Sequence, residues 1–266
     1  MLKFSSSKLL LEMFATGVFT MLFITGETGL LLIGLWILTI FCWKISSAQL
    51  NPAVTFAFVV RRDSKRMHVP MALLMIIAQV LGAWAGAWIM AFFSWSLSPM
   101  VPFNNNVIFA AMWQETFGTM IFVIFFKLCT DETLYFSKEQ AINCFIIASS
   151  YIASRAYFGG NNIRNLQNGL GSTYITNYGA CLNPAIALGI FLTSIFFSPG
   201  DSLKWVWLYP VMPFAGAIFA VIFYELVYKK TQMMLNAHSD GEGVFDRGDE
   251  AKLSESTPMD GGVLDD

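Results

Sequence analysis

Long apolar runs, separated by short polar stretches, occupy most of this chain of 266 residues. A helix needs about 20 consecutive apolar residues to cross the hydrocarbon core of a bilayer, and the longer runs are close to that length. They lie at about 9–26, 29–45, 69–93, 107–128, 139–156 and 203–228. The pattern therefore predicts six membrane-spanning helices.

Two further apolar runs, at about 51–60 and 183–194, are too short to cross, since each has about half the required length. Leu50-Asn51-Pro52-Ala53 opens the first run, and Leu182-Asn183-Pro184-Ala185 opens the second. Asn caps the exposed N–H groups of a helix start, and Pro suits the first helical position, where its missing N–H is not needed. We expect two half-helices that enter the membrane and stop, each with its positive end at depth.

The order of these elements occurs twice along the chain. Glu12-Met13-Phe14-Ala15-Thr16 in the first run resembles Glu115-Thr116-Phe117-Gly118-Thr119 in the fourth, and the two Asn-Pro-Ala stretches correspond. Repeat one covers about 9–93 and repeat two about 107–228. Three crossings per repeat is an odd number, so the repeats must run in opposite senses. The sequence thus predicts an all-α membrane domain over 9–230, with six transmembrane helices, two re-entrant half-helices and an inverted internal repeat.

Composition supports the membrane class and excludes several others. Charged residues make up 13% of the chain, about half the share of a soluble domain. The net charge of −2 leaves no basic surface for nucleic acid. The cysteines show no paired metal spacing, and the sequence contains no nucleophile triad or phosphate loop. We therefore expect no metal, no cofactor and no catalysis.

The distribution of Lys and Arg predicts the topology. Basic residues follow the first half-helix and the last spanning run, whereas 94–106 contains none. The basic residues after these two elements are Arg61, Arg62, Lys65, Arg66, Lys229 and Lys230. Because cytoplasmic loops carry an excess of Lys and Arg, both termini, including the short segment 1–8, are expected in the cytoplasm. The half-helices then enter from opposite sides.

The last part of the chain, 231–266, differs in composition. From Ala237 to Asp266 it is rich in Asp, Glu, Gly and Ser with almost no large apolar residues, which predicts a disordered acidic tail. Two interpretations stay open, a solvating tail or a binding segment for a partner protein.

Four polar residues inside apolar surroundings are the candidates for function. The side-chain oxygens of Asn51 and Asn183 would cap their own helices, which leaves each NH2 group to donate into a cavity. Such tips favour water or a hydroxylated solute and repel cations and hydrated protons. Glu12 and Glu115 are lone carboxylates in apolar runs. We expect them to accept hydrogen bonds from the loops that carry the half-helices; the alternative is a proton relay in a carrier.

Several stretches resemble the aquaporin, or major intrinsic protein, family, and the likeness covers about residues 8–230. They are Leu50-Asn51-Pro52-Ala53-Val54-Thr55, Ile77-Ala78-Gln79-Val80-Leu81-Gly82-Ala83, Glu115 with Gly118-Thr119, and Gly179-Ala180-Cys181-Leu182-Asn183-Pro184-Ala185. The resemblance implies a pore in each subunit of a homotetramer embedded in membrane lipid. It also implies passive flow of water or small neutral solutes such as glycerol, urea or ammonia.

One departure from the family concerns the outer constriction. Members normally carry Arg after the second Asn-Pro-Ala, where this chain has Ile186, and usually carry His where Gln49 stands. The other constriction positions fall at Ile33 or Leu31, at Ser150 or Tyr151, and at Ala180. A wide apolar ring would admit glycerol-sized solutes, whereas a narrow one would dewet and conduct poorly. The alternative to a channel is therefore a non-conducting structural or partner-organising member of the same fold.

Repeat two also carries a long polar stretch, 155–181, rich in Gly and Asn. It predicts an outside loop, either a cover over the mouth or a surface insertion. Arg155 or Arg164 in this stretch is a candidate to reach back toward the mouth and replace the missing cation.

Overall fold

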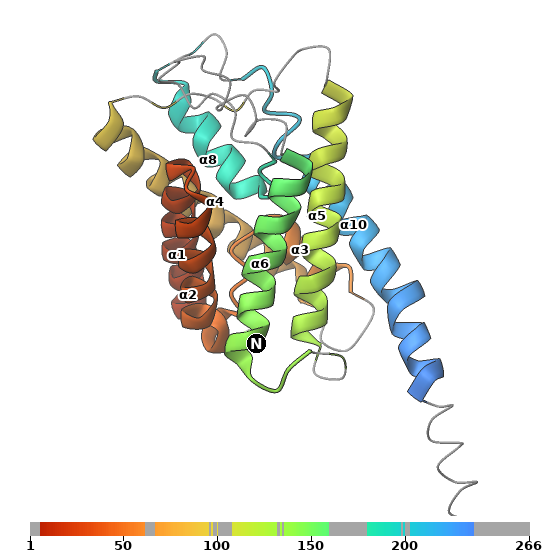
Figure 1. Cartoon of the computed structure of the whole chain (residues 1–266). Coiled ribbons are helices and arrows are strands. Elements are labelled where there is room, and N and C mark those ends of the chain that lie inside the picture. The colour runs from red at the N-terminus through yellow and green to blue at the C-terminus, as the bar shows by residue number, and fades with distance from the viewer. Residues whose placement is uncertain are drawn as a thin grey trace, which may run out of the picture. The chain divides into compact units, whose positions relative to one another are not determined.

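The structure is a computed structural model that describes residues 6–61, 67–95, 97, 100, 108–131, 134, 136–159, 180–197, 199 and 203–236. All regular structure in these ranges is helical (Figure 1). The elements are α1 (Ser6–Thr25), α2 (Thr28–Ser46), α3 (Pro52–Val59), α4 (Val69–Ser94), α5 (Ile108–Thr130), α6 (Gln140–Gly159), α8 (Pro184–Ser194), α10 (Met212–Phe223) and the π-helical turn η2 (Tyr224–Tyr228). The predicted all-α fold is confirmed.

Each of the six predicted spans contains a helix. Within the described ranges, five helical stretches are long and apolar enough to cross a membrane, namely α1, α2, α4, α5 and the stretch Met212–Asn236. The sixth, α6, has 20 residues but is more polar, because it carries an asparagine, three serines and Arg155. The chain is therefore an integral, multi-pass membrane protein.

The start of the last span corrects the prediction. The run was expected to be helical from about 203, but residues 203–211 form successive turns and α10 begins at Met212. Pro210 and Pro213 explain the shift, since Pro disfavours the helical conformation in the residue before it and is well placed in a first turn. The polar stretch at 160–179, with Arg164, and the tail from 237 onward lie outside the described residues.

The chain divides into two units, Met1–Ile222 and Phe223–Asp266. The second contains the end of α10, η2 and a helical continuation to Asn236.

Small residues let the helices of the first unit approach closely. A Cβ added to Gly82 of α4 would overlap the carbonyl oxygen of Met13 in α1, and one added to Gly86 would overlap that of Gly17. In repeat two, a Cβ on Gly216 of α10 would overlap the carbonyl of Thr116 in α5. Backbones this close rely on glycine, as is common between membrane helices. The contacts fix the frame around the two half-helices.

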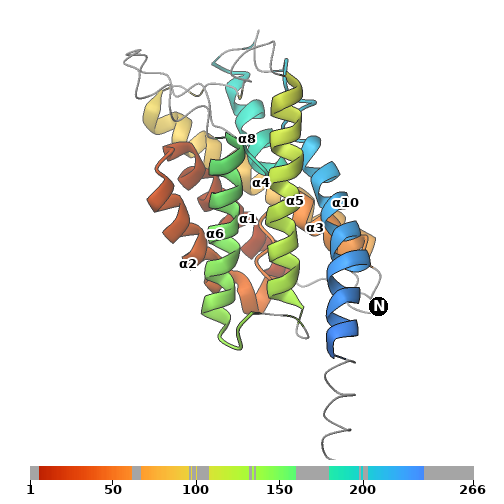
Figure 2. The ribbon, with the colours of Figure 1, turned by 45° about the vertical axis from the view of Figure 1, so that its right-hand side comes forward.

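The half-helices α3 and α8 lie within this frame, one above the other in both views (Figures 1 and 2). The segment before α3 follows the end of α2, and α8 lies toward the opposite end of the bundle in both views. This is the arrangement that an inverted repeat requires.

Candidate functional site

The site is built from the starts of the two half-helices. Asn51 and Asn183 are extended residues just before α3 and α8, and Pro52 and Pro184 take the first helical positions. Oδ1 of Asn51 accepts a hydrogen bond from the backbone N–H of Ala53 at 2.8 Å. Oδ1 of Asn183 accepts one from Ala185 at 3.0 Å. Both tips thus have the predicted cap geometry.

The two tips also hold each other. Nδ2 of Asn51 donates to the carbonyl oxygen of Leu182 at 2.8 Å, and Nδ2 of Asn183 donates to that of Leu50 at 2.9 Å. This corrects the expectation that both NH2 groups are left for a cavity. Each NH2 has two N–H donors, and one of them crosses to the opposite loop. The reciprocal pair places both half-helix starts at one point.

The residue before each asparagine has an unusual backbone conformation. Leu50 and Leu182 have φ of 49° and 57°, in the left-handed region that disfavours residues with a Cβ. These are the residues whose carbonyls accept the crossing bonds. Strain of this kind is typical of functional sites, where the surrounding structure holds it in place.

Glu12 of α1 holds the loop before α3. Its carboxylate accepts from the backbone N–H groups of Gln49 and Leu50 at 3.0 and 2.8 Å. Ser46 Oγ and Gln79 Nε2 donate to it at 2.6 and 2.8 Å. Glu12 is fully buried, and four donors surround its two oxygens. This geometry matches the expected support of the loop.

Glu115 of α5 has the equivalent position in repeat two. It accepts from the backbone N–H groups of Cys181 and Leu182 at 2.5 and 2.8 Å. Each carboxylate thus orients the two backbone residues that precede the asparagine of an Asn-Pro-Ala stretch. In each repeat, an acid on the first spanning helix thus binds the loop before the half-helix and holds it in place.

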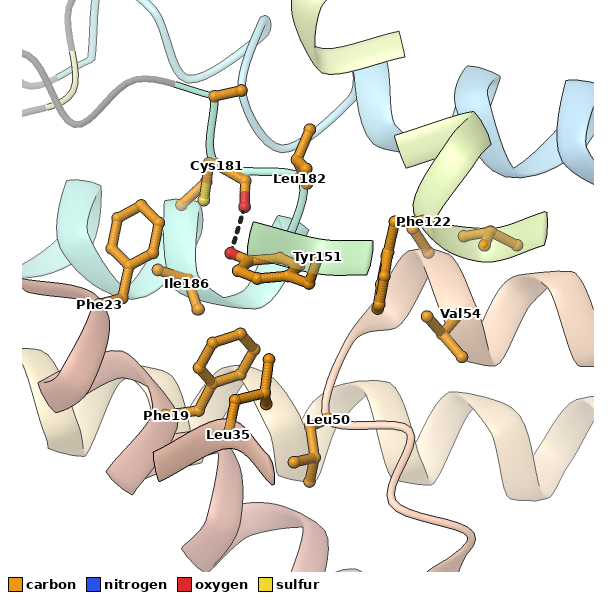
Figure 3. Packing of buried hydrophobic residues seen from close by; sticks show 14 of the residues in the cluster. Phe19, Phe23, Leu35, Leu50, Val54, Phe122, Tyr151, Cys181, Leu182 and Ile186 are labelled. Atoms are coloured by element: carbon orange, nitrogen blue, oxygen red, sulfur yellow. Dashed lines mark hydrogen bonds between the residues drawn. The ribbon is translucent and has the colours of Figure 1, made fainter. Parts of the chain in front are cut away.

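An aromatic cluster lies next to the tips (Figure 3). Tyr151 of α6 donates from its hydroxyl to the carbonyl oxygen of Cys181 at 2.7 Å. Its ring stands edge-on to Phe19 of α1 and Phe122 of α5, with both centroid distances 5.2 Å. Phe19 lies seven residues after Glu12 and Phe122 seven after Glu115, so the ring is held by equivalent residues of the two repeats.

Four residues at the centre of the bundle are closed to water in this structure. Asn183, Tyr151 and Ile186 have no exposed surface, and Asn51 has 1%. A side chain that lines an open water path would show surface to a sphere the size of a water molecule. The two half-helix starts therefore meet as predicted, but the phenol of Tyr151 and its neighbours fill the space beside them.

Comparison with known proteins identifies this architecture. The sequence profile described as Major intrinsic protein matches residues 24–224, which is most of the chain. The chain belongs to the major intrinsic protein family. Members of this family are membrane channels for water and small solutes, not enzymes. The chain is thus a channel-fold membrane protein rather than a catalyst.

The fold agrees with a solved structure of the family. The X-ray structure of the aquaglyceroporin from Plasmodium falciparum superposes with a TM-score of 0.61 at 17% sequence identity. The alignment covers 85% of this chain and 98% of that one. No curated protein sequence matches this chain at a significant level. At this identity the likeness establishes the fold alone.

The structure separates the alternatives for the family's outer constriction. Ile33 is 54% exposed on the outer face of α2, whereas Leu31 is buried. The exposure of Ile33 argues against it, and Leu31 is the alternative that faces the interior. Ser150 donates to Ile147 in its own helix and lines an outer groove between α5 and α6. Of Ser150 and Tyr151, only Tyr151 reaches the segment that leads into α8.

The other residues predicted for the constriction are interior. Ala180 is 2% exposed and Ile186 is fully buried in the cluster around Tyr151. Gln49, at the family's usual His position, is held by its backbone N–H, and its side-chain oxygen is buried with no hydrogen-bond partner among the described residues. Arg155, one helical turn after Tyr151, lies over the ring of Phe23 at 4.0 Å. Arg155 thus lies near the cluster, whereas the other basic candidate, Arg164, is outside the described residues.

Sequence reasoning gave no role to three contributors. Gln79 donates to Glu12 and to the hydroxyl of Thr55, and its signal was visible as the one amide in the apolar run 69–93. Arg61, directly after α3, forms a buried ion pair with Asp131 at the end of α5, with a nitrogen–oxygen distance of 3.4 Å. This pair joins the two repeats. No sequence pattern indicated it, because its partners lie 70 residues apart.

Proposed function

We propose that this protein is a passive channel for water and small neutral solutes of the glycerol, urea and ammonia class, and that it excludes ions and protons. The observation that carries the proposal is the reciprocal pair of half-helix tips. Asn51 and Asn183 stand at the positive ends of α3 and α8 and are joined through Leu182 and Leu50. A path between the two repeats must pass this point.

The chemistry of the tips favours neutral, oxygen-bearing solutes. Each asparagine NH2 keeps a second N–H donor after it has bonded to the opposite loop. A water or alcohol oxygen that accepts this hydrogen replaces part of its lost hydration. A cation meets two helix N-termini, which carry partial positive charge, and Arg155 adds a full charge beyond the phenol. Selection therefore rests on fixed donors and positive potential.

A carrier mechanism has little support in the geometry. A proton relay needs acids that exchange protons with water, and both Glu12 and Glu115 are fully buried. Their oxygens accept hydrogen bonds from backbone N–H groups of the two loops. Protonation would weaken the bonds that shape the half-helix starts. We assign both acids to support of the loops.

One observation favours the second candidate, a non-conducting structural member of the family. The burial of Asn51, Asn183, Tyr151 and Ile186 leaves almost no water-accessible surface at these four positions. A protein kept for membrane organisation would need the fold but no open path. The two candidates share every contact described above and differ only in whether a path opens at the centre.

We further propose a homotetramer with both termini in the cytoplasm. The described surface offers an apolar ridge on α2, which includes Leu30, Ile33 and Ile37, all about half exposed. It also offers the groove of about 570 Å³ between α5 and α6, lined by Ile121, Phe125 and Phe145 among others. Such faces suit lipid or a second copy. Native mass spectrometry from detergent tests the tetramer, and tag accessibility in sealed vesicles tests the orientation.

Flux through reconstituted protein tests the function. Proteoliposomes receive an osmotic step with sucrose, then glycerol and urea gradients, while light scattering follows their volume and a trapped dye follows pH. Water or glycerol permeability above that of protein-free liposomes, with no proton leak, supports the channel. Equal permeability with an intact oligomer supports the structural candidate. Solute flux that requires a pH gradient would instead indicate a carrier.

A further inference from the structure

We propose that Tyr151 is a gate: its phenol closes the pathway, and the pathway opens when the hydroxyl leaves the carbonyl of Cys181. This inference rests on the proposed channel function and adds regulation to the same site. It differs from a fixed constriction, because a side chain rather than the backbone blocks the path.

The seat of the ring spans both repeats. Phe19 comes from α1 and Phe122 from α5, and Tyr151 stands edge-on to both, with interplanar angles of 70° and 78°. Edge-to-face aromatic contacts are favourable but modest. They place the ring where the equivalent helices of the two repeats face each other, next to the tips. A phenol in this position fills the space between Phe19 and Phe122.

The size of the ring is sufficient to stop water. A cavity of about 150 Å³ holds a benzene ring, whereas one water takes about 30 Å³ in the liquid. The phenol therefore occupies the space of several waters. Tyr151 has no surface exposed to water, and neither has Ile186 or Leu182 around it (Figure 3). Displacement of this one ring would free room for a continuous file.

The latch is the bond from the Tyr151 hydroxyl to the carbonyl of Cys181 at 2.7 Å. A buried carbonyl that loses its partner is unfavourable, so the ring cannot leave into a dry interior without cost. Entering water satisfies both the carbonyl and the freed hydroxyl. Opening and hydration are thus coupled, and the closed form dominates when the centre is dry. The carbonyl then becomes an acceptor that a passing solute can use.

The native thiol of Cys181 provides a test that does not depend on flux. Cys181 is fully buried and lies next to the latch (Figure 3). In a background where Cys42, Cys129 and Cys144 are alanine, a small methanethiosulfonate reagent reports whether water-borne molecules reach it. We expect slow labelling with Tyr151 in place and labelling about tenfold faster or more in Tyr151→Ala, because a closed state commonly outweighs the open one by that factor.

Variants separate the ring from the latch. Tyr151→Ala removes both, and should raise water permeability as well as labelling. Tyr151→Phe keeps the ring and removes the hydroxyl, and should fall between the wild type and Tyr151→Ala. Tyr209→Ala is the matched control, since it deletes another buried phenol, packed on Phe191 rather than on Phe19 and Phe122. It should leave labelling and permeability unchanged.

The outcomes distinguish the gate from the channel. Fast labelling of Cys181 with Tyr151 present, or equal labelling in Tyr151→Ala, would overturn the gate even if the protein conducts. Faster labelling in Tyr151→Ala without any water or glycerol flux would show that the ring covers Cys181 but closes no through path, and would overturn both the gate and the proposed channel. Faster labelling together with higher flux, in a variant that elutes as the wild-type oligomer, supports both.

Discussion

At the residue scale, the side chain of each of the two asparagines makes two different hydrogen bonds. The oxygen caps the asparagine's own half-helix, and the nitrogen donates to the opposite loop. Serine caps a helix as well as asparagine does, but its hydroxyl is too short to make the second bond. This difference allows the cap and the crossing bond to be measured separately.

We expect Asn183→Ser to keep the cap and lose the bond to the Leu50 carbonyl, at a cost of about 1–3 kcal/mol for a buried unpaired acceptor. Asn51→Ser should cost a similar amount. Thermal or denaturant unfolding of the purified protein in one detergent measures both. The double variant should lose less than the sum, because separation of the tips breaks both bonds at once. Strict additivity would contradict the reciprocal pairing.

At the element scale, the structure depends on how loops and helices are held in place around the half-helices. Glu12 and Glu115 orient the two loops from behind, and glycines bring α4 against α1 and α10 against α5. The two acids act through hydrogen bonds, and the glycines act by allowing close backbone contact. Each makes a prediction of its own.

Glu115→Gln should destabilise the loop before α8. The amide keeps one acceptor oxygen, so the backbone N–H of either Cys181 or Leu182 is left facing an NH2 group. The loss should be about 1–3 kcal/mol, the cost of a buried donor without a partner. Glu139→Gln, on an exposed residue, is the control. Unfolding in detergent measures both, and equal stability of the two variants would argue against the loop-support role.

Gly82→Ala should prevent α1 and α4 from packing, since the new Cβ would overlap the carbonyl of Met13. Overpacking of a rigid contact costs about 1–3 kcal/mol or more, and here the neighbour is backbone that cannot rotate away. Gly29→Ala in α2 is the matched control, because nothing lies within 4 Å of its added Cβ. Oligomer yield and unfolding midpoint should fall for Gly82→Ala alone. A well-folded Gly82→Ala protein would contradict the described α1–α4 contact.

At the scale of the whole molecule, the architecture could be predicted from the sequence, but whether the path between the half-helices is open or closed could not. The doubled Asn-Pro-Ala stretches, the lone acids and the apolar run lengths follow local rules that hold in any context, so the half-helices and the repeat could be predicted. Membership of the major intrinsic protein family agrees with all of them.

The constriction could not be predicted because it depends on helix rotation. Leu31 and Ile33 differ by two residues, which is about 200° around an α-helix, and Ser150 and Tyr151 differ by about 100°. Neighbouring positions in an all-apolar run give no signal of which one faces inward. The crossing bonds also depend on positive φ at Leu50 and Leu182, where glycine rather than leucine is the usual indicator. Both features depend on the three-dimensional packing of the helices and loops.

The central claim is that a water path runs between the half-helix tips, past Tyr151 and Ile186. The most direct measurement is the osmotic water permeability of Tyr151→Ala proteoliposomes with and without a second change, Ile186→Trp, which refills the buried space from α8. Leu192→Trp, on a partly exposed residue of the same helix, serves as control. We predict that Ile186→Trp returns permeability to that of protein-free liposomes while Leu192→Trp leaves it high. Unchanged permeability in the folded Tyr151→Ala, Ile186→Trp protein would show that water crosses by another route.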